Sequence, residues 1–473
     1  MKNKAKIVAT LGPSSSDKKT MIAMAKAGLN VFRVNFSHGD HATHRKTIRL
    51  AKEINEELDT NLAVLADLQG PKLRIGDVKE DQFLEKGGIL EFTKEPCLGD
   101  VTRVHMNYEQ FAQDVKVGER ILLDDGKLLL NITETNSVDS VKAEVIQGGH
   151  LKSKKGVNLP NTKISLPCLT PKDLADLEVA LEEKVEWIGL SFVRNSDDVQ
   201  QLKDLIAKRN SPAKVVSKIE KPEAVLDIEN ILKVTDAAMV ARGDLGVEVP
   251  MQSVPLIQKM IVEKCHMYAK PVIIATQMME TMIDSMTPTR AEVNDVANSV
   301  LDGADAVMLS GETSVGQFPV EVIETMSKII SHIEATVDVK PKRDGMPTEK
   351  NDRYITDSIC YNASKIADQT DAMAILSMTH SGYTAFQIAS HRPTTNIVAL
   401  TSNKTILNMV SLIWGVQAFY YNKMESTDQT FSDIEKIIKD KGIVSSGDII
   451  VNIASMPIQE KGTTNMLKVS KIK

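Results

Sequence analysis

The sequence predicts an α/β protein in which a (β/α)8 TIM barrel carries an inserted small β-barrel lid domain and a C-terminal α/β domain with an open sheet. Three observations lead to this fold class. Eight short apolar runs alternate with amphipathic stretches, about ninety residues of a different pattern interrupt them, and a new series of strands follows a polar linker. At 473 residues, the chain is long enough for about two to four domains.

The eight apolar runs have the length and composition of buried β-strands. Most of them precede a stretch with helical spacing and one polar face, such as residues 17–28 and 197–210. Continuous apolar strands that alternate with amphipathic helices indicate a parallel sheet covered on both faces. Eight such strands favour a closed barrel over the main alternative, an open doubly wound sheet. The runs lie at residues 6–10, 31–36, 62–68, 187–193, 214–219, 237–241, 271–278 and 305–310.

The pattern changes after the third strand. Glycine pairs and short alternating runs there predict antiparallel strands and hairpins. Because the insert follows the carboxyl end of a barrel strand, the catalytic side of such barrels, we expect a lid. A polar, proline-containing linker at residues 340–352 precedes the last series of strands and helices. The predicted domains are residues 1–70 with 167–340 for the barrel, 71–166 for the lid, and 341–473 for the C-terminal domain.

Composition and charge exclude several classes of protein. Apolar residues make up 42% of the chain, which excludes global disorder, and the net charge of −6 argues against a dedicated nucleic-acid or membrane-surface binder. The four cysteines lie far apart, so neither a disulfide framework nor a Cys-type zinc site is expected. No apolar run has the length of a membrane span, and the N-terminus lacks a signal-peptide core. We therefore expect a cytoplasmic protein without nucleic-acid or membrane partners.

Polar and charged side chains gather where six of the predicted strands end. An unpaired buried charge costs several kcal/mol, and barrel enzymes place their chemistry at these ends, so a shared site is expected. Glu220 and Asp244 follow neighbouring strands and suit one Mg²⁺ ion, while nearby cations suit an anionic substrate. This combination predicts phosphoryl transfer or enolate chemistry. The strand-end residues are Arg33, Asn35, Ser37, His38, Asp67, Lys72, Arg74, Lys218, Glu220, Arg242, Gly243, Asp244, Thr276, Gln277, Ser310 and Glu312.

Several long segments, taken in order, resemble the pyruvate kinase family. They read KIVATLGPSS, VFRVNFSHG, GPKLR, SKKGVNLP, SKIEKPE, MVARGDLGVE, ATQMMETM, PTRAEVNDVAN and LSGETSVG. The match spans the barrel and the insert, and a weaker part reaches GTTN at residues 462–465. The resemblance implies transfer of a phosphoryl group from phosphoenolpyruvate to ADP, giving pyruvate and ATP in the last step of glycolysis. It also implies Mg²⁺ or Mn²⁺ as the cofactor and a homotetramer as the assembly.

Carried over position by position, the resemblance implies catalytic roles for Lys218, Thr276 and Ser310 and a substrate-binding role for Arg33. Lys218 would stabilise the transition state, and Arg33 would bind the transferring phosphoryl group. Thr276 and Ser310 would form part of the route that protonates the enolate carbon. Thr276 would also help to bind the substrate.

The resemblance also implies how the metal, the substrate carboxylate and the nucleotide are held. Glu220 and Asp244 would hold Mg²⁺. The backbone of Gly243 and Asp244, with the Thr276 hydroxyl, would bind the substrate carboxylate. The residues implied to contact the nucleotide phosphates are Asn35, Phe36, Ser37, His38, Arg74 and Lys155.

One position departs from the commoner family pattern. Asn35, Ser37, Asp67 and the carbonyl of Leu68 match the family's K⁺ site. Lys72 stands where many members have Glu, and an ammonium there supplies positive charge that K⁺ otherwise supplies. We therefore expect that K⁺ is not required.

In the C-terminal domain, residues 377–392 predict a strand, a loop and a helix. Thr379, Ser381, Gly382 and Thr384 suit one phosphate at the helix N-terminus, or else an ordinary capped helix. In pyruvate kinases this position resembles the loop that binds a phosphorylated activator. Because Glu460 disfavours a second phosphate, we expect a monophosphorylated sugar or nucleotide as the allosteric effector.

Other interpretations stay open at this point. A lyase or aldolase that makes a pyruvate enolate would need the carboxylates but not the lid, and a metabolite sensor would need only the C-terminal domain. The tripeptide Arg242-Gly243-Asp244 matches a cell-adhesion signal, which a cytoplasmic protein does not use. His38, His41 and His44 have a spacing that a zinc site could use, but no acidic or Cys cluster completes it. We expect His41 and His44 to be exposed helix residues.

Overall fold

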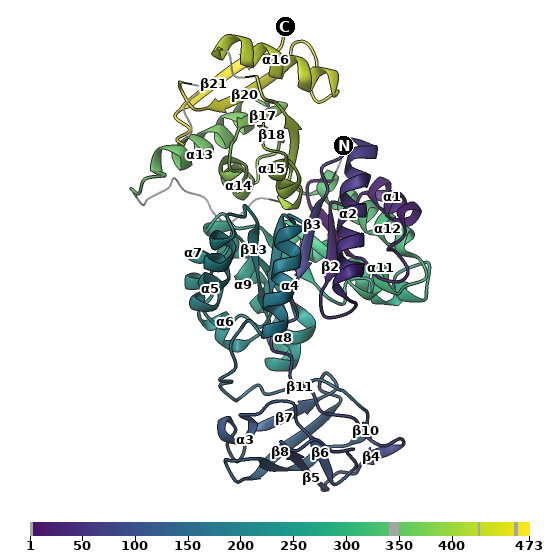
Figure 1. Cartoon of the computed structure of the whole chain (residues 1–473). Helices are drawn as coiled ribbons and strands as arrows, with labels where there is room; N and C mark the ends of the chain where they lie inside the picture. Colours follow the sequence, from purple (N-terminus) through teal and green to yellow (C-terminus); the bar gives the residue numbers. More distant parts are fainter. Residues whose placement is uncertain (1–2, 340–349, 424–425, 458–461) are drawn as a thin grey trace.

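The computed structural model describes residues 3–339, 350–423, 426–457 and 462–473. Three units follow one another along the long axis of the molecule, with the barrel in the middle, the insert at one end and the C-terminal α/β unit at the other (Figure 1). Most of the predicted linker lies outside the described residues, and the predicted domain boundaries stay a prediction. No helix in the described part of the chain is long and apolar enough to cross a membrane.

Eight parallel strands close into a barrel, because β1 pairs with both β2 and β16. This closure confirms the predicted fold class and rules out the open sheet. The strands are almost entirely buried, as their continuous apolar sequences require. The strands are β1 (Lys6–Thr10), β2 (Val31–Asn35), β3 (Ala63–Asp67), β12 (Trp187–Leu190), β13 (Lys214–Ile219), β14 (Ala237–Ala241), β15 (Val272–Ala275) and β16 (Ala306–Leu309).

Two of these strands end about three residues earlier than predicted. After β15, Thr276 and Gln277 adopt left-handed backbone conformations with φ of 70° and 55°. After β12, Phe192 does the same with φ of 54°. Positive φ is incompatible with an extended strand, so the chain turns at these residues although the apolar run continues. Both turns bring polar groups to the carboxyl end of the barrel.

Helices between the strands form the outer wall of the barrel (Figure 1). Capping boxes begin two of them, with Thr170 and Asp173 at α4 and Thr289 and Glu292 at α10. The helices of the barrel are α1 (Lys18–Ala27), α2 (His41–Leu58), α4 (Pro171–Glu182), α5 (Ser196–Lys208), α6 (Pro222–Leu226), α7 (Ile228–Val234), α8 (Arg242–Glu248), η1 (Met251–Ser253), α9 (Val254–Met267), η2 (Glu280–Ile283), α10 (Arg290–Asp302), α11 (Gly311–Ser314) and α12 (Pro319–Thr336).

The insert, called the lid below, is a six-stranded sheet with a separate two-stranded sheet. The segment of Arg74 and Ile75 connects the two edges of the six-stranded sheet, because Arg74 bridges to Gly156 beside β11 and Ile75 bridges to Met106 beside β6, which agrees with the small barrel that we expected. The lid has an apolar core of its own, separate from the core of the barrel. Its elements are β4 (Gln82–Leu84), β5 (Ile89–Thr93), β6 (Arg103–His105), α3 (Phe111–Asp114), β7 (Arg120–Leu123), β8 (Leu128–Thr135), β9 (Ser140–Gln147), β10 (Gly149–Leu151) and β11 (Val157–Asn158).

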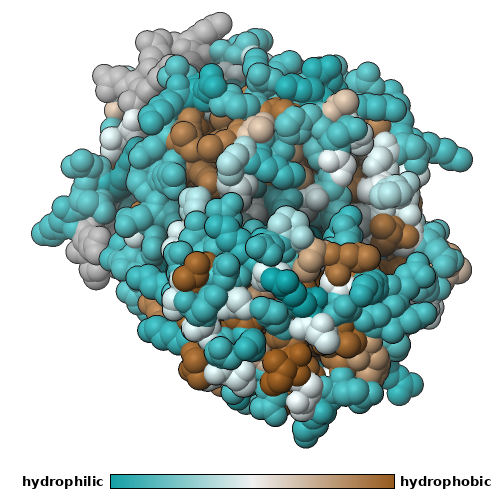
Figure 2. All heavy atoms as spheres, turned by 60° about the horizontal axis from the view of Figure 1, so that its bottom comes forward, coloured by the Kyte–Doolittle hydropathy of each residue, from teal (hydrophilic) through white to brown (hydrophobic). Residues whose placement is uncertain are grey.

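The surface seen from the lid side is mostly hydrophilic, with scattered apolar patches (Figure 2). Exposed apolar side chains in the lid include Leu98, Val117 and Val138. Single apolar residues of this kind are normal on protein surfaces.

The C-terminal unit is a five-stranded sheet with helices packed on it. Four of its strands are parallel, whereas β21 is an antiparallel edge strand that the apolar pattern did not indicate. The elements are α13 (Tyr354–Gln369), β17 (Ala374–Met378), α14 (Tyr383–Ser390), β18 (Asn396–Thr401), α15 (Lys404–Met409), η3 (Val410–Leu412), β19 (Val416–Tyr420), α16 (Thr427–Asp440), β20 (Ile449–Ala454) and β21 (Met466–Lys471).

The C-terminal unit packs against the amino ends of the barrel strands. Trp187, the first residue of β12, donates its indole N–H to the carbonyl of Met409 at 3.1 Å. The buried guanidinium of Arg392 contacts Asp305, just before β16, at 3.0 Å. One continuous apolar core therefore joins the two units, while the carboxyl ends of the strands stay on the side of the lid.

Candidate active site

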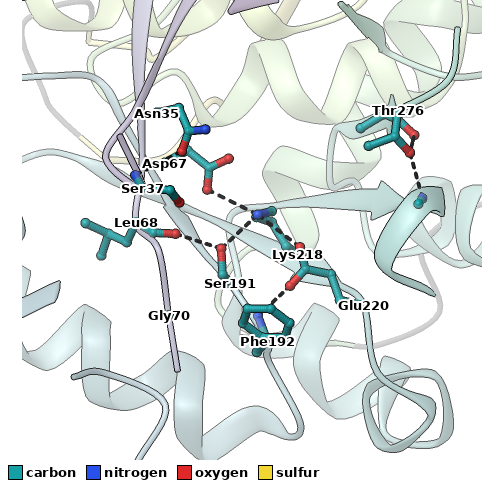
Figure 3. Close-up of polar contacts among 12 residues, drawn as sticks. Asn35, Ser37, Asp67, Leu68, Gly70, Ser191, Phe192, Lys218, Glu220 and Thr276 are labelled. Atoms are coloured by element: carbon teal, nitrogen blue, oxygen red, sulfur yellow. Dashed lines mark hydrogen bonds and ion pairs between the residues drawn. The ribbon is translucent and has the colours of Figure 1, made fainter. Parts of the chain in front are cut away.

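Lys218 lies at the centre of a buried charge cluster at the carboxyl end of the barrel (Figure 3). Its ammonium is 2.9 Å from Glu220 Oε1 and 3.4 Å from Asp67 Oδ1, and it donates a hydrogen bond to Ser191 Oγ at 2.8 Å. Burial acts to lower the pKa of Lys218, but the carboxylates of Asp67 and Glu220 outweigh it and raise the pKa above its ordinary value. Lys218 therefore stays protonated and supplies a fixed positive charge.

Asp67, at the end of β3, joins Lys218 to Arg33. Arg33 Nε and Nη2 both contact Asp67 Oδ2, at 2.7 and 2.6 Å, and Arg33 Nη1 donates to Thr10 Oγ1 at 2.8 Å. Burial alone would raise the pKa of Asp67, but Lys218 and Arg33 lower it below its ordinary value. The carboxylate stays ionised and aligns the two cations on the same face.

The second oxygen of Glu220 is held by the backbone of the segment that follows β12. Its Oε2 accepts a hydrogen bond from the backbone N–H of Phe192 at 2.7 Å. Burial raises the pKa of Glu220, Lys218 acts to lower it, and the negative charge of Asp244 raises it further. The negative charges of Glu220 and Asp244 repel each other, and a cation bound between the two carboxylates would compensate this repulsion.

The donor set fits a hard divalent cation. Glu220 Oε1 and Asp67 Oδ1 are buried without a hydrogen-bond partner among the described residues, although each faces the Lys218 ammonium. Within the same described ranges, no group of three or more His, Cys, Asp or Glu could hold a metal ion. Glu220 and Asp244 could hold a metal ion as two carboxylates, with substrate or water oxygens as its other ligands, which is how Mg²⁺ is usually bound.

The tripeptide Arg242-Gly243-Asp244 has three separate structural roles. Arg242 forms a bidentate ion pair with Asp295, at 2.7 Å on each oxygen, and donates to the carbonyl of Thr276 at 2.7 Å. The backbone N–H of Gly243 donates to Thr276 Oγ1 at 2.7 Å. Asp244 lies in the first turn of α8 and lines a cleft that also borders the lid. The stretch is therefore a strand end that arranges a site.

Thr276 is held in a strained backbone conformation by these contacts. Its φ of 70° is unusual for a β-branched residue, and Arg242 and Gly243 bind its carbonyl and its hydroxyl. The Thr276 hydroxyl also donates to the carbonyl of Ala275 at 2.6 Å. Such strain is typical of functional sites, where the surrounding structure holds one side chain in one direction.

Glu312 links the ends of β15 and β16. Its two oxygens accept hydrogen bonds from the backbone N–H groups of Ser310, at 2.7 Å, and Met279, at 3.1 Å. Burial raises the pKa of Glu312 above its ordinary value. No described hydrogen bond joins Ser310 directly to Thr276, and Glu312 is one of the residues that connect their loops.

The residues predicted for K⁺ lie together beside Lys218 (Figure 3). Asn35 Oδ1 accepts from the backbone N–H of Ser37 at 3.1 Å. The carbonyl of Leu68 accepts a hydrogen bond from Ser191 Oγ at 2.7 Å. With Asp67 Oδ1, which faces the Lys218 ammonium at 3.4 Å, these oxygens form a group that suits a monovalent cation.

Phe36, in the predicted nucleotide loop, and His44, on α2, are both buried. The Phe36 ring is fully buried and packs against the His44 ring with centroids 4.2 Å apart, so the Phe36 side chain faces the core. His44 is buried as well, which shows that our expectation of an exposed His44 is wrong. His41 is exposed as expected, and it contacts the Asp176 carboxylate at 2.7 Å. His38 is exposed at the surface of the loop.

Arg74 and Lys155 lie on the lid. Arg74 Nη1 donates to the carbonyl of Lys154 at 2.9 Å, and Lys155 forms an ion pair with Asp124 at 2.8 Å. No hydrogen bond or ion pair in the described structure joins either side chain to the barrel. Lys72 lines a cleft of about 940 Å³ between lid and barrel, together with Gly243 and Asp244. Lys72 thus shares its cleft with Asp244, one of the predicted metal ligands.

Two residues of the charge cluster were missed by the sequence reasoning. Thr10 ends β1 and binds Arg33, and Ser191 follows β12 and binds Lys218. Both are polar residues at strand ends, so the rule that found the other residues would have found these two as well. Asp295, the partner of Arg242, lies on α10 and carries no such signal.

The predicted effector loop of the C-terminal unit is closed on itself. Thr379 Oγ1 accepts from the backbone N–H of Gly382 at 2.9 Å, and Gly382 has a left-handed φ of 83°. Thr384 is buried and pairs with Ser377 Oγ at 2.6 Å, while Ser381 is exposed. Of the predicted side chains, Ser381 is the one presented to solvent. Glu460 lies outside the described residues.

Fold and site together define a class of protein. The chain is a (β/α)8-barrel protein whose strand ends bring the cations of Arg33 and Lys218 together with the buried carboxylates of Asp67 and Glu220 beneath a lid. Comparison with known families extends this. Residues 2–323 match the family model for the pyruvate kinase barrel domain, and residues 357–470 match the model for the pyruvate kinase alpha/beta domain.

Full-length relatives agree with the family models. The chain is 41% identical to pyruvate kinase 2 of Synechocystis sp., over 99% of this chain and 79% of the relative. It is 40% identical to pyruvate kinase of Clostridium perfringens, over 99% of this chain and 100% of the relative. The crystal structure of a pyruvate kinase from Cryptosporidium parvum matches with a TM-score of 0.92 and 31% identity, over 100% of this chain and 97% of that one. The chain belongs to the pyruvate kinase family and is a phosphotransferase.

Proposed function

We propose that the charge cluster around Lys218 transfers the phosphoryl group of phosphoenolpyruvate to ADP, giving pyruvate and ATP. The observation that carries this proposal is the position of Lys218. Its ammonium is held by Asp67, Glu220 and Ser191 at the end of the barrel where both cleft and lid lie. A preorganised cation of this kind stabilises negative charge that develops in a transition state.

Lys218 and Arg33 act on the transferring phosphoryl group. Asp67 contacts both cations and fixes their relative orientation, so little reorganisation accompanies the reaction. Arg33 presents a planar guanidinium that suits phosphate oxygens. Lys218 gives a compact point charge close to the carboxylates.

Glu220 and Asp244 would hold Mg²⁺, or Mn²⁺, and the general use of a divalent metal by the family agrees with this. When bound, the ion supplies positive charge to the substrate oxygens. Among the described residues, the buried Oε1 of Glu220 has no hydrogen-bond partner beyond the Lys218 ammonium that it faces, and the start of α8 places Asp244 at the cleft. K⁺ would use Asn35, Ser37, Asp67 and the Leu68 carbonyl, although Lys72 reduces the need for it.

The start of α8 binds the substrate carboxylate. Gly243 has no side chain to block the approach, and the backbone N–H groups of Gly243 and Asp244 lie in the first turn of the helix. The Thr276 hydroxyl bonds to the same Gly243 N–H, so it lies next to this carboxylate site. After the phosphorus–oxygen bond to the enol breaks, Thr276 and Ser310 take part in delivering a proton to the enolate carbon.

Arg74 and Lys155 reach the nucleotide phosphates from the lid, and the loop from Asn35 to His38 reaches them from the barrel. Phe36 contributes its backbone only, since its ring is buried. This division means that a productive nucleotide site needs the lid and the barrel together.

Two further properties belong to this proposal. A monophosphorylated metabolite binds at the loop of Thr379, Ser381 and Gly382 and activates the enzyme. The protein assembles as a homotetramer, and the highly exposed apolar side chains of Met251 and Leu256, at η1 and α9, are candidates for a subunit interface.

The proposal is tested by measuring pyruvate and ATP formation from phosphoenolpyruvate. We expect both products in equal amounts, and only when ADP and Mg²⁺ or Mn²⁺ are present. Pyruvate formation without ADP would instead favour a lyase or phosphatase. No pyruvate under any of these conditions would refute the proposal.

A further inference from the structure

A buried ion pair joins three segments that meet beside the site. Lys221 Nζ contacts Glu248 Oε1 at 2.6 Å, and both side chains are more than nine-tenths buried. The same Glu248 oxygen accepts a hydrogen bond from Asn158 Nδ2 at 2.9 Å. Asn158 belongs to β11 of the lid, which pairs with β7 in the lid sheet. Glu248 is thus a direct hydrogen-bonded link from barrel to lid.

The two barrel partners in this link are each fixed to a metal-binding segment. Lys221 directly follows Glu220 in the chain, so moving Lys221 moves the Glu220 backbone. Glu248 is the last residue of α8, whose first turn carries Asp244. A helix of this length is a stiff connection, so the position of Glu248 influences that of Asp244. The link therefore contacts the segments of both proposed metal ligands.

The energetics of the pair point to a purpose beyond stability. A buried ion pair costs desolvation, and an apolar pair of similar volume often serves stability equally well. Here Lys221 Nζ and Asn158 Nδ2 both contact Glu248 Oε1. The other oxygen, Glu248 Oε2, is buried without a hydrogen-bond partner among the described residues. Glu248, Asn158 and Lys221 line a small cavity together with Asp244 and Lys72. The link therefore borders the same space as the proposed metal ligand.

We propose that Glu248 is a positioning residue that fixes the lid, through Asn158, relative to the metal-binding end of the barrel, through Lys221 and α8. This inference rests on the proposed roles of Glu220 and Asp244. Through Glu248, the lid residues that bind the nucleotide are placed over the barrel residues that bind phosphoenolpyruvate. Weakening the link lowers kcat and weakens ADP binding, and it leaves phosphoenolpyruvate binding nearly unchanged, because the residues for phosphoenolpyruvate all lie on the barrel.

The first test replaces Asn158 with alanine, with Asn131→Ala in β8 of the lid as the matched control. We expect Asn158→Ala to lower kcat/KM for ADP about tenfold or more, the size expected when a hydrogen bond to a charged group is lost. The KM for phosphoenolpyruvate should change less than about twofold. Asn131→Ala should match the wild type. Equal kinetics for Asn158→Ala and the wild type would overturn the inference.

The second measurement follows the lid itself without turnover. Of the four cysteines, Cys97 in the lid is partly exposed and the others are buried, so it can carry a spin label. A second label on the exposed α5 position, introduced as Lys208→Cys, reports the distance between lid and barrel. Asn158→Ala should broaden or shift the distance distribution, and Asn131→Ala should not. An unchanged distribution in Asn158→Ala would show that Asn158 does not anchor the lid.

The third test separates positioning from simple stabilisation. The double variant Lys221→Met with Glu248→Leu removes both buried charges and should keep a thermal midpoint near that of the wild type. Its kcat should still be at least about tenfold lower, since the anchor for Asn158 is gone. Recovery of both stability and full activity would mean that the pair is only structural. If the double variant does not fold, the Asn158→Ala measurements decide. A wild-type protein that forms no pyruvate would refute the proposed function, whereas the distance measurement would still test the anchor.

Discussion

Replacing Lys218 with methionine removes a cation from the buried cluster while keeping a side chain of similar length. Unit charges at the 2.9 Å that separates Lys218 Nζ from Glu220 Oε1 attract by about 6 kcal/mol at an effective dielectric near 20. Charge that develops on a phosphoryl oxygen at a similar distance would gain stabilisation of that order. Each 1.4 kcal/mol or so corresponds to tenfold in rate, so kcat should fall by about 10³-fold or more.

The assay is the steady-state rate of pyruvate formation, with KM for phosphoenolpyruvate determined for each variant. We expect KM to change little, because the contact with Lys218 strengthens mainly in the transition state. The substitution also leaves Asp67 and Glu220 buried with less compensating charge, so some stability will be lost. Circular dichroism and the thermal midpoint show whether enough folded protein remains to interpret the rate.

Lys214→Met is a matched control for this experiment. Lys214 begins the same strand, β13, and pairs with Asp236 at 3.3 Å, but it lies at the opposite end of the barrel. Its loss should reduce stability without a comparable loss of kcat. A Lys218→Met enzyme within about tenfold of the wild-type kcat would refute the reasoning. An equal fall in kcat for Lys214→Met would also refute it, because the effect would then be one of general destabilisation.

Four other predictions follow from the site and its surroundings. Asp244→Asn keeps the shape but removes a charge from the metal site, so activity should collapse and be partly restored by excess Mg²⁺ or Mn²⁺; a normal metal titration would count against the assignment. A monophosphorylated sugar or nucleotide should lower the KM for phosphoenolpyruvate more than fructose 1,6-bisphosphate does, and Ser381→Asp should abolish this response; stronger activation by the bisphosphate would contradict it. The wild-type initial rate should be nearly independent of K⁺ at constant ionic strength, whereas Lys72→Glu should be slow without K⁺ and gain from its addition; a tenfold rise of the wild-type rate with K⁺ would exclude this role for Lys72. Burial lowers the pKa of Lys270 to about 8 from 10.5, so the folded protein releases this proton before the unfolded chain does, and stability should rise with pH between those values. Lys270→Met should remove this part of the pH dependence, which amounts to roughly 3 kcal/mol in the free energy of unfolding between those pH values. Denaturation midpoints from pH 7 to 11 measure it, and equal pH profiles for both proteins would show that the pKa of Lys270 is not lowered.

The order of strands and helices was predictable from the sequence by itself. Each barrel strand is buried on both faces, so it must be a continuous apolar run, and such a run can be recognised without tertiary information. The strand ends then indicated the site, because charged residues such as Lys218, Glu220 and Asp244 directly follow these runs. The same rule extends to Ser191, whose contact with Lys218 became apparent only in the structure.

Other features depend on residues that are distant in the sequence, and the tertiary structure alone decided them. The turn at Thr276 is imposed by contacts from Arg242 and Gly243, which lie more than thirty positions earlier. His44 has the polar character of an exposed helix residue but is buried against Phe36. Glu248 ends an ordinary helix in the sequence, yet its partners come from the lid and from the segment after β13. Local sequence determines which segments can be strands or helices, whereas pairing across the fold decides which charges are compensated, which oxygens stay free and which side chains meet.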